Sequence, residues 1–201
     1  MKKVVKWTVG VIIVLLFCYG YSHIAKTHML YDDKVDTSKY MGTGVLSGKI
    51  EQNFVSEEET LDGISIKCSI QGAPADSTVK VTLIDDETGE EAAHSQRKLK
   101  DIKNSKFNVF SFDTLNGCKG KEYTVVVENP DGDVENTLGV GFSYEPKQEK
   151  DTALSINGKN TDGTLIAKTV TNRFDIETFC VLVLFILYIV GFIKFLYKLF
   201  K

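Results

Sequence analysis

The chain of 201 residues can hold one ordinary domain with additional segments, and its formal net charge is −3. All 27 acidic residues lie between Asp32 and Glu177, together with 17 of the 24 basic residues, so this middle part carries a net charge of −10. Such a surface repels phosphates and argues against nucleic acid as a partner. Both ends carry only basic residues, which indicates that parts of the chain lie in different surroundings.

The N-terminal region predicts a membrane-spanning segment. Residues 1–6 are basic, and residues 7–25, "WTVGVIIVLLFCYGYSHIA", contain no acidic residue, lysine or arginine. About 20 apolar residues span a bilayer, so we expect a cytoplasmic N-terminus followed by transmembrane helix 7–25. A cleaved signal peptide is the alternative, because it also begins with a basic segment and an apolar run. Gly20 and Ser22 provide a small-x-small cleavage site.

A stalk is expected next, and then a β-domain. Residues 26–48 are polar with three glycines near their end, whereas period-two alternation begins at Lys49. In "LDGISIKCSI", Ile64, Ile66, Cys68 and Ile70 share one face. Similar short runs follow, separated by Gly, Asn and Asp clusters that favour β-turns. Residues 49–175 therefore predict an all-β antiparallel sandwich, jelly-roll-like, of eight or nine strands.

A second transmembrane helix is predicted at residues 178–200. Thr178 to Ile193 is uncharged and apolar on all sides, which disfavours a buried core helix with one polar stripe. Lysines flank both spans at the ends that lie away from the domain. The positive-inside rule then places both termini in the cytoplasm and the sandwich outside a plasma membrane. The lysines expected as cytoplasmic-side anchors are Lys2, Lys3, Lys6, Lys194, Lys198 and Lys201.

Several strand motifs carry a resemblance. "KIEQNF", "TVKVTLIDDETGEE", "FSFDTLNGCKGKEYTVVVE" and "SINGK" with "GTLIAKTV" resemble a β-sandwich ectodomain of bacterial membrane proteins of cell-surface polysaccharide assembly. In those proteins the ectodomain lies between the first two transmembrane helices of a protein related to glycosyltransferases, and it looks like a carbohydrate-binding module. The resemblance covers residues 49–175 and implies contact with a glycan or a polysaccharide-assembly membrane protein. The chain stops after its second span, without the core of those relatives, so we expect no enzymatic activity.

No motif predicts catalytic, cofactor-binding or metal-binding residues. The three histidines lack partners at metal-ligand or triad spacing. In "NPDGDVE", Asn129, Asp131, Asp133 and Glu135 alternate like the first ligands of a calcium loop, but Val134 stands where that loop needs glycine. A tight turn is the simpler interpretation, and calcium binding is the alternative.

Two cysteines and two phenylalanines are candidates for roles in the domain. Cys68 and Cys118 lie outside the spans, where a disulfide is permitted; alternatively Cys68 is a free thiol among inward hydrophobic residues. Phe110 and Phe112 share one face of a strand, opposite Phe107 and Val109, so one pair must be exposed or covered. We take Phe110 and Phe112 as candidate glycan contacts.

The sequence therefore predicts a non-enzymatic, membrane-anchored accessory protein of bacterial surface polysaccharide assembly. Its expected partners are the lipid bilayer and either a glycan or an assembly protein. The alternative is a structural subunit of a larger membrane complex that binds no glycan.

Overall fold

A computed structural model describes residues 2–72, 77–136 and 138–200. The chain divides into two compact units, each considered by itself. One unit, Thr27–Thr171, holds nearly all of the β-structure. The other contains Met1–Lys26 and Asn172–Lys201, and with them helices α1 (Lys2–Tyr21) and α2 (Ile176–Leu199).

The strands form two sheets, and the strand pairs of known register are antiparallel. The first sheet has the order β1 (His23–Met29), β13 (Ala167–Phe174), β4 (Thr60–Gln71), β9 (Gly139–Glu145) and β12 (Thr164–Leu165), with β2 (Met41–Gly42) on β9 and β7 (Lys106–Asn116) on β4. The second has the order β11 (Lys159–Thr161), β10 (Leu154–Ile156), β3 (Lys49–Val55), β8 (Glu122–Glu128), β5 (Thr78–Asp85) and β6 (Glu91–Lys98). Two short 3-10 helices, η1 (Thr37–Lys39) and η2 (Leu99–Asp101), lie in connections.

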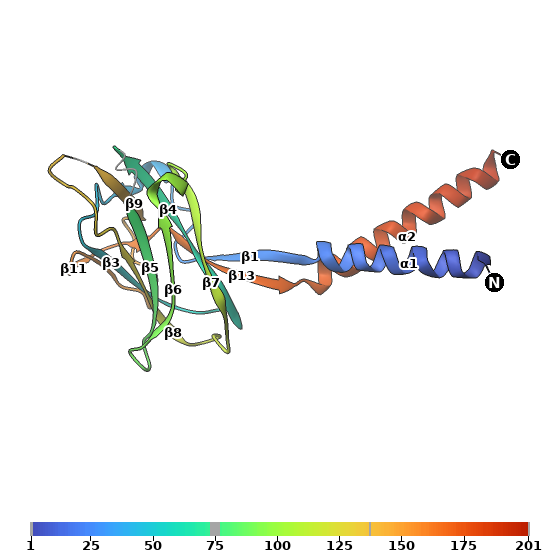
Figure 1. The fold of residues 1–201 in the computed structure, drawn as a ribbon, viewed down its shortest axis with the longest axis horizontal. Coiled ribbons are helices and arrows are strands. Elements are labelled where there is room, and N and C mark those ends of the chain that lie inside the picture. The colour runs from blue at the N-terminus through green and yellow to red at the C-terminus, as the bar shows by residue number, and fades with distance from the viewer. Residues whose placement is uncertain (1, 73–76, 137, 201) are drawn as a thin grey trace. The chain divides into compact units, whose positions relative to one another are not determined.

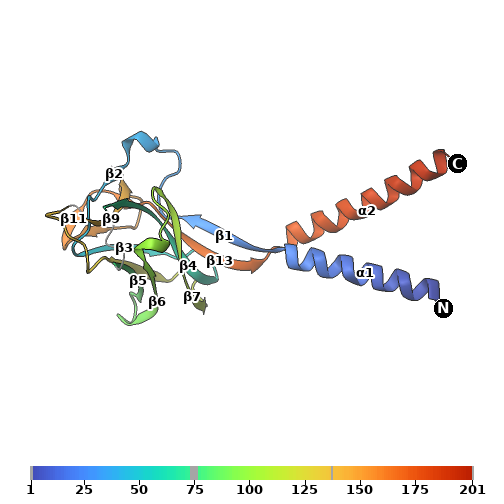
Figure 2. The same ribbon diagram turned by 45° about the horizontal axis from the view of Figure 1, so that its top comes forward.

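The two sheets face each other as a sandwich (Figures 1 and 2). One hydrophobic core lies between them. The predicted alternation places Ile64, Ile66 and Cys68 of β4 in this core. From the other sheet it receives Val81 of β5 and Val125 of β8. Each fully buried aliphatic side chain contributes about 1.5–3 kcal/mol to folding. The antiparallel sandwich predicted from the period-two pattern is confirmed.

The segment predicted as a stalk instead belongs to the sandwich. Leu30 and Leu46 are buried in the core. The Leu30 N–H donates to the Ala167 carbonyl (3.0 Å), and the Leu46 N–H donates to the Val140 carbonyl (2.9 Å). Between them, β2 pairs with β9. The polar composition of residues 26–48 suggested an exposed linker, but two apolar side chains and backbone pairing hold most of it against the domain.

A glycine allows β4 and β7 to approach closely. At Gly63 a Cβ atom would lie 2.8 Å from the Phe110 carbonyl oxygen. The ladder between the two strands shifts register between Leu61 and Gly63, as at a β-bulge. A side chain at Gly63 would therefore push β7 away from the centre of the first sheet.

A buried glutamine links the two sheets. Gln52 of β3 is fully buried. Its Oε1 accepts the Leu165 N–H of β12 (2.9 Å), and its Nε2 donates to the Ala153 carbonyl (3.2 Å). A buried polar side chain is favourable only when it is hydrogen-bonded, so the Gln52 bond fixes the position of β12 relative to β3 of the second sheet.

The helices differ in their capacity to span a membrane. In the described part of the chain one helix, α2, is long and apolar enough, with 24 residues, a mean hydropathy of 2.7 and no burial within the protein. The apolar part of α1 is shorter, Thr8–Tyr21. The first span was predicted at residues 7–25, but helix α1 ends at Tyr21 because residues from His23 onward form strand β1. The two-helix flank therefore stays a prediction.

The predicted lysine anchors lie on both helices. Lys6 is exposed on α1, and Lys194 and Lys198 are exposed on α2. The side chains of Lys2 and Lys3, and all of Lys201, lie outside the described residues.

Substitution of Gln52 tests the link between the sheets. We expect Gln52→Ala to lower the free energy of unfolding by about 2–5 kcal/mol, because it leaves buried backbone groups unpaired and opens a cavity. Thermal unfolding of the detergent-solubilised chain measures the change. The control is Gln96→Ala, at an exposed position on β6, and equal melting temperatures for the two variants would contradict the assignment.

Candidate functional site

The structure places the predicted glycan contacts on the inner face of β7. Phe110 is 0% exposed, and Phe112 packs against the same core. Phe110 pairs with Ile64 of β4, so both side chains point between the sheets. Phe110 is therefore unavailable to a glycan, and the choice of this face was wrong. The outward side chains of β7 are Phe107, which is half-buried, and Val109, which is 40% exposed.

Phe107 belongs to a group of three rings that we call the aromatic cluster: Tyr31, Tyr40 and Phe107. The Tyr31 and Phe107 rings are stacked, with centroids 6.3 Å apart and an interplanar angle of 16°. Tyr40 meets Tyr31 edge-on at 6.2 Å. Tyr31 follows β1 and Tyr40 precedes β2, so the segment predicted as a stalk supplies two of the three rings. All three side chains are half-buried.

Two lysines lie over these rings. The Lys168 Nζ is 4.4 Å from the Phe107 centroid, and the Lys67 Nζ is 5.4 Å from that of Tyr40. Lys67 also pairs with Phe107 across the β4–β7 ladder. Each cation–π contact contributes about 0.5–1 kcal/mol at an exposed site. The aromatic cluster thus offers apolar ring surface beside positive charge.

The hydroxyls of the cluster stay protonated. Burial is the largest cause that raises the pKa of Tyr31 and of Tyr40, and the carboxylates of Asp33 and Glu145 raise both further. A protonated phenol both donates and accepts hydrogen bonds. The two tyrosines can therefore serve a ligand that carries hydroxyl groups.

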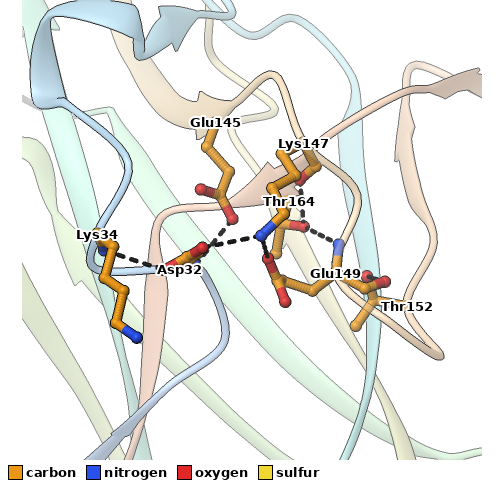
Figure 3. A network of polar contacts seen from close by, with 7 residues as sticks. All are labelled: Asp32, Lys34, Glu145, Lys147, Glu149, Thr152 and Thr164. Carbon is orange, nitrogen blue, oxygen red and sulfur yellow. Dashed lines mark hydrogen bonds and ion pairs between the residues drawn. The ribbon is translucent and has the colours of Figure 1, made fainter.

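A buried carboxyl holds the segment that carries Tyr31. Glu145, at the end of β9, is 0% exposed, and its Oε1 accepts the Asp32 N–H (2.9 Å; Figure 3). Its Oε2 has no hydrogen-bond partner in the described structure. Burial raises the Glu145 pKa most, and the neighbouring Glu149 and Asp32 carboxylates raise it further against the opposing effects of the Asp32 N–H and Lys147.

An ion-pair network reinforces this attachment. The Lys147 Nζ lies 2.8 Å from Asp32 Oδ2 and 2.9 Å from Glu149 Oε1 (Figure 3). The hydrogen bond between Asp32 and Lys147 lowers the Asp32 pKa and raises the Lys147 pKa. Thr164 Oγ1 accepts the Glu149 N–H and donates to the Lys147 carbonyl. The chain beside Tyr31 is therefore fixed to the connection after β9.

The side chains of Asn129, Asp131 and Asp133, which resemble the first ligands of a calcium loop, form hydrogen bonds with other groups of the protein. Asn129 Nδ2 donates to the Leu46 carbonyl (3.1 Å), and Asp131 Oδ2 accepts the Thr78 N–H (3.1 Å). Asp133 accepts two hydrogen bonds from Asn136. Within the described ranges, no group of three or more His, Cys, Asp or Glu residues is arranged to hold a metal ion.

Cys68 and Cys118 are both buried free thiols, so the disulfide that the sequence permits is not formed and the free-thiol alternative holds. The Cys118 N–H donates to the Glu59 carbonyl at the start of β4, whereas Cys68 lies near the other end of that strand. At a rise of about 3.3 Å per residue, this separation is roughly 30 Å, far beyond the reach of a disulfide. Burial raises the pKa of Cys68 to about 12, so it acts as a small core residue.

A second set of rings lies in the helical unit. Phe174 contacts Tyr19 (centroids 5.4 Å apart), His23 (5.5 Å) and Phe179 (5.5 Å). The Asp175 N–H beside it donates to the Ser22 carbonyl (2.8 Å), and the Asp175 side chain caps α2. Aromatic side chains therefore gather where α1 ends and α2 begins.

Comparison with known proteins leaves the family open. No family model and no curated protein matches the chain. Among solved structures it is similar to the clostridial cysteine protease Cwp84 after propeptide cleavage, with a TM-score of 0.46 and 13% identity. The match covers 74% of this chain and 40% of the protease chain.

The buried carboxyl leads to a prediction on pH. A carboxyl whose pKa rises on folding stabilises the folded chain below its unfolded-state pKa, about 4.3, and this stabilisation is lost as the pH rises through the folded value. Glu145→Gln mimics the neutral form. We therefore expect the melting temperature of the variant, relative to the parent chain, to increase from about pH 4 to about pH 7.

Thermal unfolding across this range provides the measurement. Glu135→Gln, at an exposed position in a turn, is the control and should leave the pH profile unchanged. A difference between Glu145→Gln and the parent chain that is constant with pH would refute the assignment.

Proposed function

We propose that this protein is a non-enzymatic, two-pass membrane protein whose extracytoplasmic sandwich contacts a glycan in bacterial surface polysaccharide assembly. The observation that carries the proposal is the aromatic cluster of Tyr31, Tyr40 and Phe107. The apolar C–H face of a sugar packs on aromatic rings, while its hydroxyls need polar partners. The cluster supplies both through its rings and its two phenolic hydroxyls.

The way the cluster is held supports a binding role. Glu145 and Lys147 fix Asp32, the neighbour of Tyr31, by a hydrogen bond and an ion pair. Preorganised rings lose little conformational freedom when a ligand binds, so more of the interaction energy appears as affinity.

The membrane part of the proposal rests on the helices and their ends. α2 is long and apolar enough to span a bilayer. Aromatic belts mark membrane–water interfaces, and the rings of Tyr19, Phe174 and Phe179 gather at the ends of α1 and α2 nearest the domain in sequence. Lys6, Lys194 and Lys198 lie toward the opposite ends. This distribution favours two spans with both termini in the cytoplasm.

A structural subunit of a membrane complex is the second candidate. An apolar groove of about 440 Å³ separates α1 from α2, and Gly10, Val14, Val183 and Leu187 line it. A further helix could pack there, since small residues such as glycine allow close approach in membranes. A stoichiometric membrane partner captured by crosslinking in native membranes would favour this role.

Protease protection tests the topology. With different epitope tags on the two termini, protease added to spheroplasts is expected to remove the domain and to leave both tags intact inside. Lysis before the protease is added is the control and should expose the tags. A domain that resists the protease in intact spheroplasts, with a susceptible terminus, would contradict the two-pass arrangement.

Glycan binding tests the role of the cluster. On a glycan array, the detergent-solubilised chain should bind at least one surface polysaccharide. Phe107→Ala and Tyr31→Ala should each weaken this binding about three- to tenfold, because each removes one stacking surface. Val55→Ala, at an exposed position of the other sheet, is the matched control. Binding that survives both ring substitutions would exclude the cluster as the contact.

A further inference from the structure

A basic segment lies beside the aromatic cluster in an otherwise acidic domain. Residues 97–106, "RKLKDIKNSK", contain five basic residues and one acidic residue, Asp101. They run from the end of β6 through η2 to the start of β7. Five of the 17 basic residues of the acidic middle part are therefore concentrated in one corner of the sandwich.

In the described part of the chain, the exposed lysines of this segment lie close together in sequence without a carboxylate at ion-pair distance. Lys49, Lys121 and Lys147 lie within 4 Å of an Asp or Glu oxygen. No ion pair is found within the described residues for the four exposed lysines of the segment. These are Lys98, Lys100, Lys103 and Lys106. Unpaired like charges repel one another, so their concentration at one place favours an anionic ligand.

Arg97 is held in place without losing its charge. Its Nη1 donates to the Val109 carbonyl (3.1 Å), and its Nη2 donates to the Asp101 carbonyl (2.9 Å). Both partners are neutral backbone groups. A guanidinium fixed in this way is preorganised to receive carboxylate or phosphate oxygens at its remaining N–H groups.

A cavity lies against these side chains. It has a volume of about 710 Å³, within the usual range of ligand sites. It is lined by Thr78, Gln96, Arg97, Lys98, Lys100 and Asp101. Three of the six lining residues are basic and two more are neutral hydrogen-bonding groups, so the lining suits an anion that also carries hydroxyls.

The cavity and the aromatic cluster share strand β7. Arg97 binds the carbonyl of Val109, whose exposed side chain lies on the same face of β7 as Phe107, two residues away. Residues two apart on a strand are about 7 Å apart. Phe107 and the carbonyl that Arg97 binds therefore lie at neighbouring positions of one strand, which lets an extended polymer reach from the rings toward the basic side chains.

We propose that this cavity, here called the basic pocket, binds carboxylate or phosphate groups of an anionic saccharide polymer. The inference rests on the proposed function and adds the charge of the glycan. Arg97 and Lys98 contact the anionic group, Lys100 and Lys103 add attraction along the strand end, and Thr78 and Gln96 bind hydroxyls. Because Asp101 offsets part of the charge, each site is weak alone, and a repeating polymer gains avidity by occupying it together with the aromatic cluster.

The test compares an anionic and a neutral polymer on the full chain in neutral detergent. Polygalacturonate supplies repeating carboxylates, dextran is neutral, and sodium pyrophosphate probes the pocket without a sugar. The triple variant Lys98→Gln, Lys100→Gln, Lys103→Gln should weaken polygalacturonate binding about tenfold and remove pyrophosphate binding. Raising the salt concentration should weaken polygalacturonate binding to the parent chain more than to the variant.

A control with the same change in charge separates local from global effects. Lys119→Gln, Lys150→Gln, Lys159→Gln alters three exposed lysines outside this segment and should change either affinity less than twofold. Equal loss in the two triple variants would overturn the pocket, because it would show that net charge alone decides binding.

The remaining outcomes distinguish the two proposals. If dextran binds as well as polygalacturonate and the pocket variant changes neither, the pocket inference is overturned and glycan contact stands. If the triple variant loses pyrophosphate binding while the parent chain binds neither polymer, that result contradicts glycan contact and the saccharide part of this inference. Displacement of pyrophosphate by phosphatidylglycerol vesicles but not by polygalacturonate would assign the pocket to lipid headgroups and overturn it as a saccharide site.

Discussion

The burial of both faces of strand β4 is the constraint on which the sandwich depends. Ile64 and Ile66 point into the core, while Asp62 and Ser65 on the opposite face are also almost fully covered. A covered strand must find hydrogen-bond partners for its backbone within the protein. β4 does so by pairing with β7, β13 and β9. These three strands in turn hold the segment of Leu30, the outward ring of Phe107 and the end of β9 that carries Glu145.

The sequence predicted the parts of this arrangement that depend on local alternation. Ile64, Ile66 and Cys68 share one face because the side chains of a strand repeat every two residues, and in the structure this face lies in the core. Alternation alone could not choose between the two faces of β7, since Phe110 and Phe107 stand on apolar faces alike. The pairing of Phe110 with Ile64 of β4 places Phe110 in the core and leaves Phe107 on the outer face. Tyr31 and Tyr40 were missed because their segment is polar and its contacts with β9 and β13 are distant in sequence.

Lysines of the domain lie in two kinds of surroundings, paired with carboxylates or not. Where lysines and carboxylates meet, as at Asp32 and Lys147, they fix a loop, and the pKa values of both groups shift to favour the ion pair. At residues 97–106 the positive charges are left without carboxylates, although acidic side chains outnumber basic ones elsewhere in the domain. That run was visible in the sequence. The sequence alone does not show whether carboxylates neutralise the run; among the residues that the structure describes, none forms an ion pair with its lysines.

The bond from Arg97 to Val109 has a consequence for how copies of this chain meet one another at high concentration. β7 is paired with β4 on one side, and its other edge carries backbone groups that a foreign strand could join. Arg97 occupies one of those carbonyls and places a fixed positive charge beside the edge. A second copy of the chain would bring its own arginine and lysines to the same edge and be repelled. The corner proposed to bind anions would therefore also keep neighbouring copies from joining edge to edge into aggregates.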